Sequence, residues 1–540
     1  MKVKILDCTL RDGGYVNNWD FGISNIKSII SKLSKSNVEI VECGFFSDKE
    51  IWKDDQSKFN SIEDMEKCIV DTNENTMYAG LINLGEFDEE MIPDYKGGLV
   101  SGLRVAFHMK QVEEAIEYCS KLVKKGYKVF IQPMVTINYT DKQLLELVEK
   151  VNEIKPYAFY IVDSFGVMKQ SDLTRIFYLV DNNLNEDISI GYHAHNNLQL
   201  AYSNAQSLID LRTSRSIIID SSVFGMGRGA GNLNTELFTN YLNTSICKNY
   251  IIEEFLEIID DILNSIYAEN YWGYSLAHYL SATFNCHPNY ASYLSDKNAL
   301  TISGISDILR VMPRDKKVKF DKQYIENLYV EYQKNNINDV IDREIIKSKL
   351  IGKQILVLAP GKNLEKYIEE VKKYIDEDTI VISTNFISKE IESDYIFVSN
   401  FKRYNNINES KIMSTLKDKL ILTSNIKHNL EDSFKINYNI LLNEFEGVVD
   451  NAGLMLIKLL IKCGIKEVKL AGFDGYSYEN TENYARKDLK LPINHNNVKE
   501  LNKNMTRALD YLSKDINIQF ITPSKYNKCN FNKECEISYI

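Results

Sequence analysis

The sequence predicts two α/β units, a (β/α)₈ barrel in the N-terminal part and a Rossmann-like domain in the C-terminal part. In the first 245 residues, eight short apolar runs alternate with amphipathic stretches. Near-continuous apolar strands separated by helices indicate a parallel sheet, and eight such units in this length are typical of a closed barrel. A doubly wound sheet is the alternative. A second alternation of strands and helices begins near residue 352.

The barrel strands follow one another at regular spacing. We expect them at residues 3–8, 38–45, 76–83, 102–107, 128–135, 158–165, 188–195 and 216–225. Between them lie helical stretches such as 111–125 and 141–154, in which apolar residues recur at helical spacing.

The remaining chain divides in two. Residues 246–350 are helical in pattern and predict an appendage to the barrel domain of residues 1–245. Residues 351–540 predict the Rossmann-like domain, with strands in 353–360, 379–386, 394–400, 419–425, 467–476 and 516–524. We expect the seam at "KSKLIGK", residues 347–353.

Composition narrows the class of protein. A chain of 540 residues is too long for one core, and its charged content of 26% is ordinary for a globular protein. The net charge of −11 argues against a nucleic-acid binder. Nine cysteines are scattered without CxxC pairs, and no signal-peptide core or long apolar stretch occurs. We expect a cytoplasmic homo-oligomer that binds neither nucleic acid nor membrane.

Polar residues gather where the predicted barrel strands end. In a (β/α)₈ barrel these carboxyl ends surround one mouth, and catalytic groups come from several strands. The residues concerned are Asp7, Arg11, Asp12, Glu42, Asp163, Ser164, His193 and His195.

The segment "GYHAHNN" predicts a metal site. His193 and His195 stand at i and i+2 on a strand, so both imidazoles face the same side. Imidazole is a common metal ligand, and a carboxylate at the end of strand 1 would complete a mixed nitrogen and oxygen site. The alternative is a pair of hydrogen-bonded histidines without metal.

The segment "TLRDGG" places Arg11 and Asp12 beside two glycines. Arg11 could stabilise an oxyanion that develops on a substrate, and Asp12 could supply charge to the metal. Gly13 and Gly14 permit close backbone approach. The alternatives are a surface turn, or a structural ion pair of Arg11 with Asp7 or Glu42.

Five motifs together resemble the DRE-TIM metallolyases. They are "TLRDGG" (9–14), "VECGFF" (41–46), "VDSFG" (162–166), "GYHAHNN" (191–197) and "GMGRGAGN" (225–232), and the match spans residues 1 to about 300. This superfamily includes 4-hydroxy-2-oxovalerate aldolase, hydroxymethylglutaryl-CoA lyase and isopropylmalate synthase, and the aldolase branch is the most similar. The resemblance implies a TIM barrel and reversible cleavage of a 4-hydroxy-2-oxo acid to pyruvate and an aldehyde.

The resemblance also implies roles for individual residues. Asp12, His193 and His195 would bind a divalent ion, with Asn232 as a fourth donor. We expect Mn²⁺ or Mg²⁺, with Zn²⁺ as the alternative. Arg11 would steady the pyruvate enolate, and Glu42 would lie in the polar shell beside it. Asp163 and Ser164, at the end of strand 6, would contact the substrate.

Two departures from the family pattern leave the reaction open. Tyr15 stands where the oxovalerate aldolases carry a histidine base, so the base is Tyr15, His108 or a metal-bound water. The cysteine-bearing loop of the CoA lyases is missing from 225–232. An acyl-CoA-dependent Claisen condensing enzyme and a non-catalytic metal-binding scaffold are the alternatives to an aldolase.

The C-terminal segments "APGKNLEKY", "DNAGLMLIKLLIKCGIKEVKLAGFDGY" and "NHNNVKELNKN" resemble the bacterial sialyltransferase-type fold. The resemblance implies binding of a nucleotide or nucleotide sugar and a role in surface-glycan biosynthesis. Its candidate site comprises Gly361, Asp474 and His495. The alternatives are a helix or turn cap for Asp474 and an exposed loop residue for His495.

Overall fold

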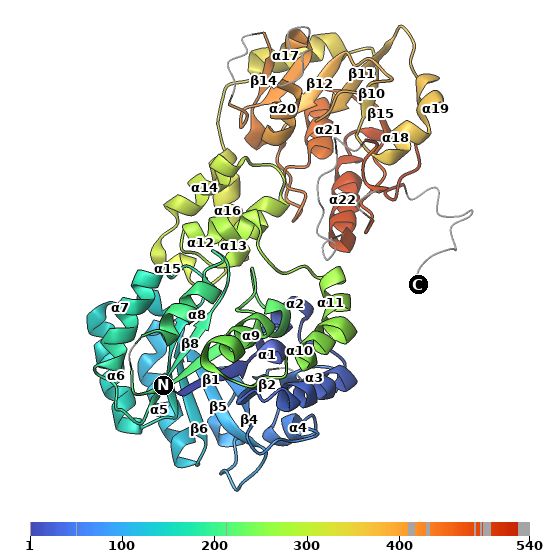
Figure 1. The fold of residues 1–540 in the computed structure, drawn as a ribbon. Helices are drawn as coiled ribbons and strands as arrows, with labels where there is room; N and C mark the ends of the chain where they lie inside the picture. The colour runs from blue at the N-terminus through green and yellow to red at the C-terminus, as the bar shows by residue number, and fades with distance from the viewer. Residues whose placement is uncertain are drawn as a thin grey trace. The chain divides into compact units, whose positions relative to one another are not determined.

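A computed structural model gives the fold of this chain (Figure 1). It describes residues 2–49, 51–211, 213–408, 416–427, 432–479, 482–486, 489 and 498–527. The chain divides into two compact units, which are described separately. Unit 1 comprises residues 1–291 and 312–320, and unit 2 comprises residues 292–311 and 321–540.

Unit 1 contains the predicted barrel. Its eight strands are β1 (Lys2–Asp7), β2 (Ile40–Phe46), β4 (Met77–Asn83), β5 (Val100–Phe107), β6 (Lys128–Pro133), β7 (Ala158–Asp163), β8 (Ser189–Ala194) and β9 (Ser216–Ser221). All neighbouring strands are parallel, and β1 pairs with both β9 and β2, which closes the sheet. A short strand, β3 (Lys58–Phe59), adds to β2. The prediction of a closed (β/α)₈ barrel is confirmed.

Helices surround the barrel because each buries one apolar face against the strands. They are α3 (Ile23–Lys35), α4 (Ile62–Glu66), α5 (Val112–Lys124), α6 (Asp141–Ile154), α7 (Gln170–Asp181), α8 (Ala201–Ile209) and α9 (Thr235–Ile246). In α6, for example, Leu144, Leu147, Val148 and Val151 are buried, and Thr140 caps the first turn by accepting the Gln143 amide. This outer layer forms the largest hydrophobic core of the unit.

Further short helices follow the barrel in unit 1. They are α10 (Ile252–Ile258), α11 (Asn264–Glu269), α12 (Leu276–Thr283), α15 (Arg314–Lys317) and the first residues of α13 (Pro288–Asp296). The segment 312–320 packs back on this part of the chain, where the Tyr290 hydroxyl donates to the carbonyls of Lys316 and Lys319 at 2.8 Å each. Among the described residues, no helix has the length and apolar character needed to cross a bilayer.

Unit 2 contains a second parallel sheet, with the order β14-β13-β12-β11-β10-β15-β16. The strands are β10 (Gln354–Leu358), β11 (Thr379–Thr384), β12 (Tyr395–Val398), β13 (Leu420–Thr423), β14 (Phe434–Ile436), β15 (Glu467–Ala471) and β16 (Asn517–Phe520). The chain runs outward from β10 to β14 and then returns to place β15 on the other side of β10. This doubly wound order is consistent with a Rossmann-like domain.

The helices of unit 2 include some that precede the sheet in sequence. They are α14 (Ile302–Val311), α16 (Lys322–Gln333), α17 (Val340–Leu350), α18 (Lys362–Lys366), α19 (Ile368–Lys372), α20 (Phe401–Asn408), α21 (Ala452–Lys462) and α22 (Val498–Leu512). Ile346 and Leu350 of α17 belong to the same buried core as α21. The predicted helical segment 246–350 is therefore shared between the two units, and the division differs from the expected seam at 347–353.

Candidate functional site

Three predicted ligand residues meet at the carboxyl ends of the barrel strands. Asp12 lies at the end of α1 (Thr9–Asp12), directly after β1, while His193 lies in β8 and His195 just beyond it. One potential ligand atom from each residue lies within 4.8 Å of the other two, and all three residues are buried. The i and i+2 spacing on β8 brings both imidazoles to the same side, as the sequence predicted.

The charge state of this cluster suits a cation. Burial disfavours ionisation of Asp12, but Arg11 and the two imidazoles outweigh burial and hold the pKa of this carboxyl well below its usual range. Burial lowers the pKa of His195 to about 3, although the Asp12 charge opposes this. At neutral pH the cluster therefore offers a carboxylate and a neutral imidazole, the forms that bind divalent metals.

Two buried atoms beside the cluster have no hydrogen-bond partner. They are Nδ1 of His195 and Oδ1 of Asn232. The Asn232 amide donates to Asp12 Oδ2 at 2.6 Å, and Asn232 forms an isolated antiparallel bridge with His195. Unpartnered buried polar atoms are costly unless a ligand satisfies them. The residues present therefore fit a divalent ion held by Asp12, His193 and His195, with Asn232 as a further oxygen donor.

A buried ionic network, which the sequence did not predict, contacts the His193 ring through Asp220. The His193 Nδ1 atom lies 3.0 Å from Asp220 Oδ2 of β9. Asp220 also pairs with Arg104 of β5 and accepts a hydrogen bond from the Tyr160 hydroxyl at 2.9 Å. Burial raises the pKa of Asp220, but Arg104 and His193 outweigh burial, and the net pKa lies below its usual value. A carboxylate behind a ligating imidazole fixes the orientation of its ring.

Arg11 belongs to the same network. Its Nη1 donates to Asp12 at 2.6 Å, and its Nε donates to Glu42 Oε2 at 2.7 Å. Glu42 Oε1 in turn lies 2.8 Å from Nη1 of Arg104, so one carboxylate joins two guanidinium groups. Arg11 therefore forms the ion pair with Glu42 that was the structural alternative to a role at the substrate.

The candidate bases Tyr15 and His108 have different electrostatic surroundings. Tyr15 is 39% exposed as a whole, but the protein atoms around its hydroxyl desolvate it and raise the pKa of the phenol, although the charge of Arg228 opposes the rise. The Arg228 guanidinium lies 5.5 Å from the centre of the Tyr15 ring. Burial and the positive charges of Lys319 and Arg228 lower the pKa of His108. His108 is thus a neutral imidazole at pH 7, whereas Tyr15 remains a protonated phenol.

Asp163 and Ser164 make their hydrogen bonds to the protein backbone. The Asp163 carboxylate accepts the amides of Val167 and Met168 at 2.9 Å each, and Ser164 Oγ accepts the Val135 amide at 2.9 Å. Burial raises the pKa of Asp163 to about 6. These hydrogen bonds hold the loops at the ends of β6 and β7, and the substrate contact expected of both residues stays a prediction.

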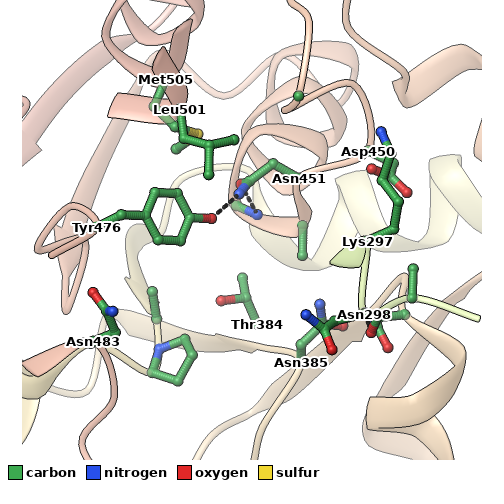
Figure 2. A pocket seen from close by; sticks show the side chains of 18 of the residues that line it. Lys297, Asn298, Thr384, Asn385, Asp450, Asn451, Tyr476, Asn483, Leu501 and Met505 are labelled. Atoms are coloured by element: carbon green, nitrogen blue, oxygen red, sulfur yellow. Dashed lines mark hydrogen bonds between the residues drawn. The ribbon is translucent and has the colours of Figure 1, made fainter. Parts of the chain in front are cut away.

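Unit 2 has a cavity of its own, with a volume of about 360 Å³. It opens at the carboxyl ends of β10, β11 and β15, where the strand order reverses. Such switch points are the usual ligand sites of doubly wound sheets. Figure 2 shows side-chain amides and hydroxyls around it, among them Thr384, Asn385, Asn451, Tyr476 and Asn483.

The predicted C-terminal site coincides only partly with this cavity. Gly361 and Asp474 both line it. A Cβ at Gly361 would lie 2.2 Å from the Gly472 carbonyl, so only glycine permits the close approach of these two strand ends. Asp474 Oδ2 accepts the Asn363 amide at 2.6 Å, which makes this carboxylate a cap of the short helix α18. His495 lies outside the described residues.

Comparison with known proteins places the barrel in a family. Residues 102–261 match the family described as HMGL-like. The barrel is an HMGL-like domain of the DRE-TIM type. The chain is 25% identical to the 4-hydroxy-2-oxovalerate aldolase of Pseudoalteromonas translucida over 274 residues, which cover 48% of this chain and 76% of that enzyme. It is 23% identical to the oxaloacetate decarboxylase of Mycobacterium tuberculosis over 232 residues, 43% of this chain and 67% of the relative.

Among solved structures, the HMGL-like domain resembles the N-terminal domain of a Bacteroides vulgatus protein, with 26% sequence identity and a TM-score of 0.44. The match covers 54% of this chain and 96% of that chain. It also resembles the HMG-CoA lyase of Brucella melitensis, with 14% identity and a TM-score of 0.40, over 48% of this chain and 96% of that one.

Proposed function

We propose that the HMGL-like barrel is a divalent-metal-dependent carbon–carbon lyase that cleaves a 4-hydroxy-2-oxo acid to pyruvate and an aldehyde. The buried cluster of Asp12, His193 and His195, with Arg11 beside it, is the observation that carries the proposal. The relatives named 4-hydroxy-2-oxovalerate aldolase support the reaction class. When bound, a divalent ion supplies Lewis acidity to the reaction. We propose Mn²⁺ or Mg²⁺, because the donors are mixed oxygen and imidazole groups, with Zn²⁺ as the alternative.

Arg11 would stabilise the negative charge that develops when the carbon–carbon bond breaks. Two of its nitrogens are fixed by Asp12 and Glu42, so the guanidinium is held in one orientation before substrate arrives. A preorganised donor of this kind acts without reorganisation during the reaction. Asn232 would hold Asp12 in place through its amide.

A neutral imidazole is the better candidate for the general base. His108 has a lowered pKa and is unprotonated at pH 7, whereas the pKa of Tyr15 is raised. We propose that His108 takes the proton of the substrate 4-hydroxyl group and that Tyr15 shapes the site through its contacts with Trp19 and Phe45.

The test is product analysis with purified protein and 4-hydroxy-2-oxopentanoate. Equal amounts of pyruvate and acetaldehyde, formed only with divalent metal, support the proposal. Pyruvate and CO₂ from oxaloacetate, without aldehyde release from the hydroxy acid, indicate a decarboxylase instead. Thiol release from an acyl-CoA indicates a condensing enzyme. Metal binding without any of these reactions indicates a scaffold.

We propose in addition that unit 2 binds a nucleotide or nucleotide sugar in the cavity at its sheet switch point. The amide and hydroxyl lining suits a ligand rich in hydroxyl groups. Asn451 supports this idea, because its side chain caps α21 through the Gly453 amide at 3.1 Å and also lies 3.4 Å from the Tyr476 hydroxyl at the cavity wall (Figure 2). We also propose that the protein acts as a homo-oligomer in the cytoplasm, in the biosynthesis of a surface-glycan component.

Calorimetry of the full chain against a panel of nucleotides, beginning with cytidine nucleotides, tests the second site. Binding should weaken in Asn451→Ala and persist in Asp12→Asn, whose change lies in the barrel. A folded chain that binds no member of the panel contradicts the proposal.

A further inference from the structure

The barrel mouth contains a cation that the proposed reaction does not use. Arg228 lies in the glycine-rich loop after β9, and within the described residues its one hydrogen bond runs from Nη2 to the Ser164 carbonyl at 3.2 Å. Its Nε is buried without a partner. Among the described residues, no carboxylate forms an ion pair with it, whereas Arg11 and Arg104 each have two such partners. A guanidinium left unpaired in a partly buried site is a candidate anion receptor.

Arg228 contacts the Tyr15 ring, and its charge acts on Asp12, His108 and His287. The Tyr15 ring lies 5.5 Å from the guanidinium carbon. His287 packs edge-on against Phe165, with ring centroids 6.4 Å apart. The charges of Arg228 and His108 also act on the His287 imidazole. Burial, together with the charges of Arg228 and His108, lowers the pKa of His287 to about 3. Lys319 adds a second positive charge beside His108.

The other two arginines of the mouth are already paired with carboxylates. Arg11 and Arg104 face Asp12, Glu42 and Asp220, which gives two cations and three anions, and Asp12 is also a candidate metal ligand. The metal-site residues and Arg11 suffice for the 2-oxo acid group of the proposed substrate. The charge of Arg228 acts on His108 and His287, the charge of Lys319 acts on His108, and none of these four residues is an acid. We name these four residues the outer basic rim.

We propose that the outer basic rim, through Arg228, binds a second anionic group on the substrate, distant from the 2-oxo acid end. This inference rests on the proposed lyase function and specifies its substrate class: an aldehyde, and the corresponding 4-hydroxy-2-oxo acid, that carries a carboxylate or a phosphoryl group. In the condensation direction a methyl proton leaves pyruvate, the new carbon–carbon bond forms at the aldehyde carbon, and the aldehyde oxygen gains a proton. The distal anion is unchanged by this step.

Binding is the first test, because it does not depend on turnover. The Mg²⁺-loaded protein is titrated by calorimetry with 2-oxoglutarate and with 2-oxopentanoate, which have the same chain length but differ in the distal carboxylate. We expect 2-oxoglutarate to bind at least tenfold more tightly. In Arg228→Met this preference should fall by roughly 10- to 100-fold, the usual effect of losing a hydrogen bond to a charged group. Arg228→Lys should retain part of it.

The control is Arg175→Met, which removes an exposed arginine that pairs with Asp141 on the outer helices. This variant should keep the wild-type preference. Equal affinity of the wild-type protein for the two acids would overturn the inference. Equal weakening of both acids in Arg228→Met would also overturn it and would assign Arg228 to the carboxylate next to the carbonyl.

Kinetics then distinguish the two kinds of anion. Rates of condensation with pyruvate are compared for butanal, succinic semialdehyde and glycolaldehyde phosphate. Selection of one anionic aldehyde over butanal identifies the distal group as a carboxylate or a phosphoryl group. Loss of that selection in Arg228→Met supports binding of the distal anion by the outer basic rim. Preference for butanal contradicts the inference while leaving the lyase proposal intact. Failure of every aldehyde, with the binding preference retained, counts against the lyase proposal alone.

Discussion

At the scale of single residues, the site depends on groups whose charges are set by their neighbours. Asp12 is ionised because the Arg11 guanidinium lies beside it, although burial alone would favour its neutral form. His195 is neutral because it is buried. Neither state follows from residue type, yet together they create a site for a divalent cation.

Removal of one ligand should therefore abolish metal binding without unfolding the barrel. We expect His193→Ala and Asp12→Asn to lose most of the bound Mn²⁺, because two remaining donors cannot replace a third. Elemental analysis after dialysis measures the metal content. His278→Ala, a histidine outside the cluster whose Nδ1 lies 3.1 Å from the Gly273 carbonyl, is the control and should keep its metal. Full metal content in both ligand variants would refute the assignment.

The raised pKa of Asp7 predicts that the free energy of unfolding depends on pH. Burial raises the pKa of this carboxyl from 3.8 to about 6, against the hydrogen bonds from Thr235 and Thr9. Between these values the folded protein binds a proton that the unfolded chain does not, so stability from Asp7 is complete below pH 4 and is lost as the pH rises through 6. The loss amounts to about 3 kcal/mol.

Asp7→Asn removes this titration. We expect the free energy of unfolding of the variant, relative to wild type, to rise by about 3 kcal/mol between pH 4 and pH 7. Urea unfolding at several pH values provides the measurement. A difference that stays constant over this range would show that Asp7 has an ordinary pKa in the folded protein.

At the scale of elements, the site is assembled by parallel strands that are distant in sequence. Arg104 from β5 lies fully buried inside the barrel and joins Glu42 of β2 to Asp220 of β9. Through Asp220 this link reaches the His193 ring. The strands thus fix an imidazole that would otherwise rotate.

Asp220→Asn tests this positioning role. We expect metal affinity to fall by roughly 10- to 100-fold, because the ring loses the carboxylate that orients it. Metal titration and thermal unfolding are measured together. Asp181→Asn is the matched control, since Asp181 also pairs with an arginine, Arg215, but lies outside the site. If both variants bind metal like wild type, Asp220 has only a structural role.

The sequence predicted the strands and the histidine pair but missed the network behind them. The strands were recognisable because eight apolar runs recur at regular spacing, and i, i+2 spacing on a strand fixes which face the imidazoles share. Arg104 and Asp220 are single charged residues in otherwise apolar strands, and their partners come from strands far away in the chain. The sequence feature that could have identified Arg104 and Asp220 is a single charged residue within an otherwise apolar strand. The strand β14 was missed because only Phe434–Ile436 form it.

At the scale of the whole molecule, the two units are interleaved in sequence. The chain passes from one unit to the other after residues 291, 311 and 320. The sequence predicted one seam at 347–353, whereas the two compact units alternate along the chain. An amphipathic helix does not reveal in its sequence which core it will cover. Ile346 and Leu350 pack in the core of unit 2, and the Tyr329 hydroxyl donates to Asp450 at 2.5 Å.

A fragment of residues 351–540 should therefore be less stable than one of 321–540. The shorter fragment lacks α16 and α17, which leaves apolar surface of the unit 2 core exposed and the Asp450 carboxylate without the Tyr329 hydroxyl. We expect a loss of several kcal/mol, since burial of each large apolar side chain contributes about 2 kcal/mol. Thermal unfolding followed by circular dichroism compares the two. Equal melting temperatures of the two fragments would show that α16 and α17 do not stabilise unit 2, and would favour a boundary near residue 350.

We propose that the barrel mouth is a metal-dependent centre that forms the enolate of a 2-oxo acid. Exchange of the pyruvate methyl protons with deuterium in D₂O, followed by NMR with the Mg²⁺-loaded protein, measures this step without an aldehyde. We expect exchange with wild type, none after metal removal, and a loss of at least 100-fold in Arg11→Lys, whose ammonium group cannot reproduce the fixed guanidinium fork. No exchange by a folded, metal-loaded wild-type protein, or equal exchange after metal removal, would contradict it.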